Sequence, residues 1–420
     1  MASARYLAAS MASLLSLWSN AARAETTLHA TGSVSAAYTD NANAEAGSSN
    51  RRNRRQVGTP YFLATPGLLL NQENKTTNYS LSYQKALSYF PEYRQQNGDS
   101  DVVAGEGRFE LSERDVLAFQ LAGTRSSVSS YLLDLGGSNA DTLEALGNEN
   151  RLRVDLSQSW SHLLNQRWSL LQGTGLGGFA TLSSDDHVRW RVTEQLAFDY
   201  TLPRDNYRLS MSSGYLQGGE SGEAQNQTHH FVVESRADWR HQLTNNWNSS
   251  LGAGANYSKV LGGLWGIAPA VEGSVGYEYR AFNGRLLYNH SRQLSLETGT
   301  LFESDQASLE SGLLLSREHA ISLTAGSSLA RHAELSFDER RGVVGRVTVL
   351  STDAQLDWSP SIVSITLSYS HLRQFDSTSP VRPEFARNVA MVTVSAFFPE
   401  KKRLAPSTLK RIESKPRVLE

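Results

Sequence analysis

Apolar and polar side chains alternate along almost every segment of this chain after residue 26. In the segment 151–160, Leu152, Val154 and Leu156 occupy every second position, and polar side chains lie between them. A period of two residues is that of a β-strand, in which successive side chains point to opposite faces of a sheet. The chain of 420 residues is therefore predicted to be an all-β protein with many strands.

The connections between the predicted strands alternate in length. Short polar turns are predicted near 71–75, 113–115, 165–166, 203–206, 244–246, 282–284, 317–319 and 359–361. Longer loops, mostly rich in Gly, Ser and Asn, are predicted near 40–56, 91–101, 127–150, 183–187, 219–228, 260–266, 298–301, 332–343 and 375–387. Eight turns and nine loops connect 18 strands. Short turns at one end and longer loops at the other are typical of outer-membrane barrels.

The predicted fold is one domain, residues 25–398, forming a closed antiparallel up-and-down transmembrane β-barrel of about 18 strands. An open sheet in lipid would leave costly unpaired backbone groups at its edges. The first strand, Leu28–Asp40, is therefore expected to pair with the last, Arg387–Phe398. A secreted array of β-sandwiches is the alternative, because its polar faces would meet solvent in the same pattern.

The two ends of the chain differ from its middle. Residues 1–24 resemble a secretory signal peptide, with Arg5 before an apolar stretch and a cleavage site at Ala22-Arg23-Ala24. The expected location is the outer membrane of a Gram-negative bacterium. Residues 399–420 form a basic tail that is expected to be disordered in the periplasm. After the signal, no window of 18 consecutive apolar residues is present.

The composition excludes several classes of function. The chain has no cysteine, so disulfides and thiolate metal sites are absent. Its net charge of -2 argues against a nucleic-acid partner. No catalytic motif, metal site or cofactor-binding motif is found, and no cofactor is predicted. The adjacent His229 and His230 would point to opposite faces of a strand, where they could not easily share one metal.

One short pattern occurs twice. The residues Trp160, His162, Leu164, Trp168, Gly173 and Gly175 recur at Trp239, His241, Leu243, Trp247, Gly252 and Gly254, each 79 positions later (239 minus 160). Each copy is predicted to be a strand, a polar turn and a second strand. Trp160, Trp168, Trp239 and Trp247 are predicted to lie at the membrane interface, where amphipathic rings are favoured.

Charged residues on the predicted inner face are candidates for lining a pore. They are Arg153, Asp155, Arg189, Arg191, Glu234, Arg236, Asp238, Arg240, Glu272, Glu278 and Arg280. They could tune selectivity, or they could be a ladder of cross-strand ion pairs that only stabilises the wall. Their mixed signs argue against strong ion selectivity and suit a neutral or mildly charged polymer.

Two predicted external loops have features of their own. Arg51, Arg52, Arg54 and Arg55 in the first could contact lipopolysaccharide or another polysaccharide, or could be a solvated charge run. The apolar residues of the loop 128–150 could fold inward as a plug or rest on the rim as a lid.

Short motifs at the ends of the mature chain point to a family. They are Tyr38-Thr39-Asp40-Asn41, Thr65-Pro66-Gly67-Leu68-Leu69-Leu70 and the final strand from Arg387-Asn388-Val389 to Phe397-Phe398-Pro399. With the layout of the whole mature chain, they resemble the outer-membrane β-barrel proteins of myxobacterial-type exopolysaccharide secretion systems. The resemblance implies an 18-stranded barrel that exports polysaccharide, downstream of a periplasmic polysaccharide-export protein. The basic tail is a departure from that family.

Three functions follow as hypotheses. The first is an outer-membrane channel for exopolysaccharide export, without catalysis and with outer-membrane lipids, lipopolysaccharide and the polymer as partners. The second is a passive diffusion porin for small solutes, which an inward-folded segment lined by opposed acidic and basic arcs, or stable trimers, would favour. The third is a membrane-embedded enzyme or adhesin, for which no specific feature speaks.

Overall fold

The computed structural model describes residues 25–40, 58–94, 97–127, 150–182, 188–218, 228–260, 265–294, 301–316, 320–335, 343–360, 362–375 and 385–398. The predicted signal peptide, the arginine cluster at 51–55, residues 128–149 of the long loop and the basic tail lie outside them. Among the described residues, none belongs to a helix long and apolar enough to cross a membrane.

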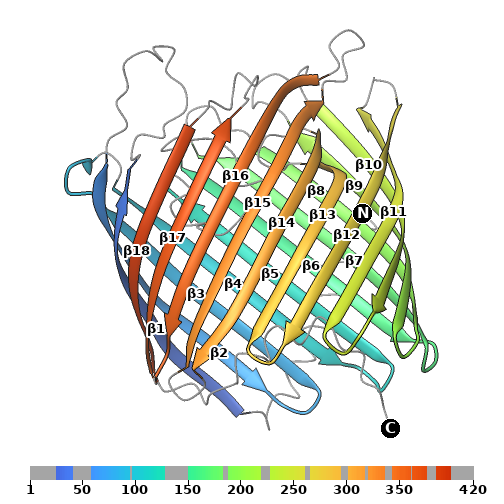
Figure 1. Ribbon diagram of the computed structural model, residues 1–420, viewed down its shortest axis with the longest axis horizontal. Coiled ribbons are helices and arrows are strands. Elements are labelled where there is room, and N and C mark those ends of the chain that lie inside the picture. Colours follow the sequence, from blue (N-terminus) through green and yellow to red (C-terminus); the bar gives the residue numbers. More distant parts are fainter. Residues whose placement is uncertain are drawn as a thin grey trace, which may run out of the picture.

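The described residues form one antiparallel sheet of 18 strands, as predicted. The strands are β1 (Glu25–Thr39), β2 (Thr59–Glu73), β3 (Thr77–Tyr89), β4 (Gly98–Glu110), β5 (Asp115–Ser126), β6 (Arg151–Leu163), β7 (Trp168–Thr181), β8 (Val188–Thr201), β9 (Asp205–Gly218), β10 (Thr228–Gln242), β11 (Trp247–Val260), β12 (Trp265–Tyr279), β13 (Phe282–Leu294), β14 (Leu301–Ser316), β15 (Ile321–Leu335), β16 (Val343–Trp358), β17 (Val363–Phe375) and β18 (Phe385–Phe398). Figure 1 shows that the strands are tilted and arranged around a barrel, with the short turns at one end.

The barrel is closed, because β1 pairs with both β2 and β18. Tyr38 lies opposite Ala390 in the closing ladder. The hydroxyl groups of Ser35 and Thr393 are 2.9 Å apart across it, and Asp40 Oδ1 accepts a 2.7 Å hydrogen bond from the main-chain nitrogen of Asn388. The predicted pairing of the first and last strands is confirmed, and no sheet edge is left open in lipid.

The register gives every strand an outer and an inner face. The exposed leucine, valine and aromatic side chains of the described strands lie on the outer face, and Leu163 at the end of β6 is the exception. Leu152, Val154 and Leu156 all point outward, as the alternation predicted. The strands exceed the roughly 9–11 residues that a tilted strand needs to span a bilayer, so they extend beyond the apolar band.

Six of the eight predicted turns overlap the observed connections, the turn predicted at 317–319 lies outside the described residues, and the turn predicted at 282–284 is misplaced. The turn after β12 is formed by Arg280 and Ala281, and Phe282–Gly284, where the turn was predicted, already belong to β13. Arg280 has a positive φ of 54°, which makes this two-residue connection tight enough to start β13 early.

Candidate functional site

The inner face of the barrel carries most of the charged residues that were predicted to line a pore. The strand register places Arg153, Asp155, Arg189, Arg191, Glu234, Arg236, Asp238, Arg240, Glu272 and Glu278 on this face. Arg280 lies in the turn after β12 instead, and its guanidinium group is 5.0 Å from the centre of the Tyr279 ring. The prediction placed it on the inner wall because the alternation was extended one residue too far.

Three of these residues form one ion network on β6 and β8. Arg153 Nε is 2.6 Å from Asp155 Oδ2, and Arg191 Nη2 is 3.7 Å from Asp155 Oδ1. Between them on β7 lies Gly177, which is opposite both Asp155 and Arg191. Because glycine has no side chain, the two charges meet across a strand that would otherwise separate them.

Four more residues form a second network on β10 and β12. Arg236 lies 2.9 Å from Asp238, 3.0 Å from Glu272 and 3.8 Å from Glu234. The intervening position on β11 is again a glycine, Gly252, which is opposite both Asp238 and Glu272. One arginine thus faces three carboxylates.

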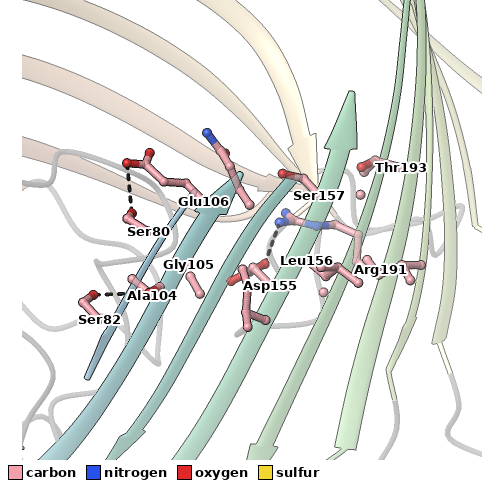
Figure 2. A pocket seen from close by; sticks show the side chains of 16 residues that line it. Ser80, Ser82, Ala104, Gly105, Glu106, Asp155, Leu156, Ser157, Arg191 and Thr193 are labelled. Atoms are coloured by element: carbon pink, nitrogen blue, oxygen red, sulfur yellow. Dashed lines mark hydrogen bonds and ion pairs between the residues drawn. The ribbon is translucent and has the colours of Figure 1, made fainter. Parts of the chain in front are cut away.

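A hollow of about 540 Å³ lies in the inner wall beside the first network. Figure 2 shows Asp155 and Arg191 at one side of it, and Ser80 with Glu106 at the other. Ser80 Oγ donates a 3.2 Å hydrogen bond to Glu106 Oε1. Hydroxyl groups of Ser82, Ser157 and Thr193 complete the polar lining, so the hollow can hydrogen-bond a hydroxylated solute.

The end of β13 leaves the wall and lies inside the barrel. The pairing of β12 with β13 stops at Val271 and His290, although β12 begins at Trp265 and β13 continues to Leu294. Beyond this point β13 pairs only with β14, with Leu294 opposite Leu301. We call residues 291–294 and 301–304 the inner hairpin.

The inner hairpin is held on the inner faces of β7 to β11. Leu294 packs against a buried apolar cluster of Phe179 on β7 and Leu216 on β9. Arg191 Nη1 donates a 3.0 Å hydrogen bond to the carbonyl oxygen of Leu294. Arg292 Nη1 donates a 2.9 Å hydrogen bond to Ser258 Oγ on β11. Apolar packing at the end and polar bonds along the side therefore fix the hairpin.

Small side chains make room for the inner hairpin. Gly214 faces Leu294, and a Cβ atom at that position would lie 3.2 Å from Leu294 Cδ1. A Cβ atom at Gly266 would lie 2.9 Å from Arg292 Nη1. Ala268 and Ala270 follow on the same inner face of β12 and are buried. The wall is thus shaped to accept this segment.

The inner hairpin was missed in the sequence, although a signal was present. Arg292 and Glu303 occupy positions in the outward phase of their strands and form an ion pair at 3.2 Å. Charged residues in the lipid-facing phase indicate that a segment does not face lipid. The predicted inward element was the loop 128–150, and all of it but Asn150 lies outside the described residues.

The repeated tryptophan pattern adopts the same geometry twice on the outer face. Asn165 accepts hydrogen bonds from the main-chain nitrogens of Arg167 and Trp168, and Thr244, the residue 79 positions later, does the same for Asn246 and Trp247. The register places Trp160, Trp168, Trp239 and Trp247 outward at the turn end. Their role at a membrane interface stays a prediction.

Each copy also has an aspartate that the sequence pattern did not reveal. Asp115 at the start of β5 is 3.2 Å from Trp160 Nε1 and 2.7 Å from His162 Nδ1. Asp205 at the start of β9 is 2.9 Å from Trp239 Nε1 and 2.8 Å from His241 Nδ1. These aspartates are 90 positions apart (205 minus 115), so the spacing of 79 does not find them.

The two adjacent histidines point to opposite faces of β10. His229 Nδ1 is 2.7 Å from the hydroxyl oxygen of Tyr215, which lies on the outer face. His230 is buried on the inner face.

No family model matches this chain, and no curated protein is significantly similar to it. Among solved structures, it is similar to the siderophore receptor PirA of Pseudomonas aeruginosa, with 7% identity, 88% of this chain and 80% of that chain covered, and a TM-score of 0.46. It is also similar to OccAB3 of Acinetobacter baumannii, with 8% identity, 89% of this chain and 99% of that chain covered, and a TM-score of 0.43. For OccK9 of Pseudomonas aeruginosa the identity is 10%, 89% of this chain and 99% of that chain are covered, and the TM-score is 0.47.

The fold therefore rests on the chain's own strand pairing, which defines a closed 18-stranded β-barrel of the outer-membrane type. Its inner wall carries paired charges and hydroxyl groups, and an inner hairpin lies within it.

Proposed function

We propose that this protein is an outer-membrane channel through which exopolysaccharide leaves the cell. The observation that supports this most is the largely neutral, polar inner surface of five neighbouring strands among the 18. Across β17, β18, β1, β2 and β3, the inward charged side chains that the structure describes are Arg387 and Glu73, at the two ends of the wall.

Between those two residues, most inward positions carry hydroxyl or amide groups, and Leu63, Leu69 and Met391 are among the apolar exceptions. The hydroxyl and amide groups belong to Ser364, Thr366, Ser368, Thr393, Ser395, Ser33, Ser35, Thr65, Ser80, Ser82 and Gln84. Such groups exchange hydrogen bonds with sugar hydroxyls about as well as water does, so a polymer can slide past without being held. A neutral wall also leaves uncharged sugars without an electrostatic barrier.

The part of the inner wall that carries the two ion networks is compatible with the same substrate. Asp155 is matched by Arg153 and Arg191, and Arg236 lies among three carboxylates. Paired charges of opposite sign largely cancel at a distance, so they produce a weaker potential in the lumen than a ring of one sign. The two networks therefore serve to stabilise the wall and to orient hydroxyl groups at close range.

The transport direction and the partner come from the resemblance noted in the sequence. Polymer would reach the turn end of the barrel from a periplasmic polysaccharide-export protein and leave through the loop end. In this proposal the protein carries out no catalysis and needs no cofactor.

The decisive experiment blocks the lumen in living cells. In a strain lacking the gene, we expect surface polysaccharide to be lost and the intact gene to restore it. Ser157→Cys places a thiol on the lining of the hollow. A bulky maleimide should stop secretion in this variant, while the natural chain, which has no cysteine, should be unaffected by the same reagent. Unchanged surface polysaccharide in the deletion strain would disprove the export function.

Passive diffusion of small polar solutes is the second candidate, and the inner hairpin favours it. A segment docked on the inner wall narrows an 18-stranded barrel, which by strand number alone can hold an aqueous channel. Open channels of the purified protein in planar bilayers, together with normal polysaccharide secretion in the deletion strain, would favour this function over export.

A further inference from the structure

Within the described strands, outward lysines and arginines lie near one end of the barrel only. The outward lysines and arginines of the strands, apart from Arg292 on the inner hairpin, are Lys85, Arg125, Lys259, Arg331, Arg346 and Arg373. All six are near the loop end. At the turn end, the outward strand positions that the structure describes carry aromatic, apolar, polar or acidic residues, with no lysine or arginine among them.

Three of these arginines form a patch on adjacent strands. Arg331 on β15 is opposite Thr348, Arg346 on β16 is opposite Ala333, and Arg373 on β17 is opposite Leu350. Arg331 is level with Thr348, and Arg346 and Arg373 each lie two residues from that level, on opposite sides of it. Strands are about 4.8 Å apart, so the backbones of β15 and β17 are separated by about 10 Å. All three side chains are exposed.

The surroundings of this patch suit an amphipathic anion. The guanidinium group of Arg373 lies 5.5 Å from the centre of the Phe375 ring, which restrains its orientation. Towards the middle of the barrel, exposed Leu329 is the next outward residue after Arg331 on β15, and on β17 Tyr369 and Leu367 follow His371. Asp305 is opposite Arg331, but its carboxylate accepts hydrogen bonds from Tyr288 at 3.1 Å and His290 at 2.7 Å.

A second group of cations at the same end is neutralised locally. Lys85 is 2.8 Å from Asp99 and 3.4 Å from Asp101, and Arg125 is 3.3 Å from Asp101. Beside the patch on β15 to β17, the described part of β14 places two carboxylates in the outward phase, Asp305 opposite Arg331 and Glu303, which pairs with Arg292. Arg125, which is paired with Asp101, therefore serves as the control for the three arginines of the patch.

We propose that Arg331, Arg346 and Arg373 bind the phosphate groups of lipid A, the membrane anchor of lipopolysaccharide, in the outer leaflet. Guanidinium groups bind phosphate through paired charge-assisted hydrogen bonds. The acyl chains then lie along the apolar band below. The site depends on the barrel lying in the outer membrane with its loop end outward, and not on the exported substrate. It is separate from Arg51, Arg52, Arg54 and Arg55, whose predicted lipopolysaccharide contact stays untested.

Native mass spectrometry of the purified barrel in detergent tests this site. The probes are lipid A carrying both phosphates, the same lipid without phosphates, and inorganic phosphate. We expect the natural chain to retain the phosphorylated lipid, and the triple variant Arg331→Gln, Arg346→Gln, Arg373→Gln to bind it at least about tenfold more weakly. Arg125→Gln, which changes an arginine paired with Asp101, should bind within about twofold of the natural chain.

Three results would overturn the proposal. They are equal binding of the lipid with and without phosphates, equal binding by the natural chain and the triple variant, and full competition by inorganic phosphate at concentrations similar to those of the lipid. Heat-modifiable migration on gels verifies that each variant is folded. If the triple variant does not fold, Arg331→Gln and Arg373→Gln alone should each weaken binding about threefold, and no loss in either would reject the site.

Discussion

The guanidinium group of Arg191 on β8 donates a 3.0 Å hydrogen bond to the main-chain carbonyl oxygen of Leu294, which is 103 positions later at the end of β13. Four strands, β9 to β12, separate β8 from β13 in the wall. A bond between the two can form only because the end of β13 crosses the interior. This contact therefore connects the ion network around Asp155 with the segment that narrows the channel.

Loss of this contact should widen the channel. Arg191→Met removes the donor, and Leu294→Ala removes the side chain that packs against Phe179 and Leu216. Truncation of a fully buried leucine typically costs about 2–5 kcal/mol. Leu294 is half-buried, so a smaller loss is expected, and it destabilises the docked state of the inner hairpin. We expect the double variant to have a larger and noisier single-channel conductance in planar bilayers.

Arg240→Met is the control for that experiment. Arg240 is also an inner-face arginine, but it lies near the turn end, opposite Ser250, away from the inner hairpin. Its replacement should leave the conductance close to that of the natural chain. Equal conductance in all three proteins would mean that the inner hairpin does not limit the passage.

Gly254 should not tolerate even the smallest side chain. A methyl group at this position of β11 would overlap the carbonyl oxygen of Ser235 and approach the backbone of Arg236. Backbone atoms cannot rotate away, so Gly254→Ala should destabilise the barrel by about 1–3 kcal/mol, the usual cost of overpacking. Gly273→Ala on the neighbouring strand is the control, because the nearest atom to its new Cβ is 4.0 Å away.

The measurement for Gly254 is the urea concentration at which heat-modifiable migration is lost. A lower midpoint for Gly254→Ala than for Gly273→Ala is expected. The same midpoint for both would show that the strand shifts to accommodate the methyl group.

Arg236 should control the ion preference of the lumen. It is the cation among Glu234, Asp238 and Glu272, so Arg236→Gln leaves three carboxylates without their shared partner. The wall then becomes more negative, and the reversal potential in a potassium chloride gradient should shift towards cation selectivity. Adding Glu272→Gln should reverse part of the shift, and a shift towards anions would contradict the assigned geometry.

The alternation of side chains was enough to predict the barrel, because each strand must present one apolar and one polar face. The predicted inner positions agree for Arg153, Arg236 and Glu272, whose strands stay regular. The prediction failed for Arg280, where a positive φ ends the strand one residue earlier. A period of two carries no information about such a local backbone conformation.

Contacts across the lumen were also beyond the sequence pattern. The strand continues to Leu294, and the charge of Arg292 in the outward phase is the signal in the sequence that these residues face the opposite wall and not lipid. Which surface a strand end packs against depends on the small residues at Gly214 and Gly266, far away in the chain. The partner of each Trp-x-His pair is likewise on the neighbouring strand, so a repeat search along one strand does not find it.

Asp115 and Asp205 should both contribute to stability, because each accepts from one tryptophan and lies beside one histidine. In each copy the indole and imidazole rings are also close, with centres 5.6 Å apart for Trp160 and His162 and 5.5 Å apart for Trp239 and His241. Replacing Asp205 with alanine removes the acceptor of the bonds from Trp239 and His241, and replacing Asp115 also removes the acceptor of a 2.6 Å bond from Ser112 Oγ. A lower urea midpoint for the loss of heat-modifiable migration is expected for each variant.

The two sites share no residue, so the losses should add in the double variant Asp115→Ala, Asp205→Ala within about 0.5 kcal/mol. Quenching of tryptophan fluorescence by brominated lipids gives an independent readout, because released indole rings should change their depth in the bilayer. Ser161→Ala is the matched control, since Ser161 lies between Trp160 and His162 but points to the inner face. Unchanged stability and quenching in the double variant would show that the tryptophans hold their positions by ring packing and apolar burial alone, without the carboxylates.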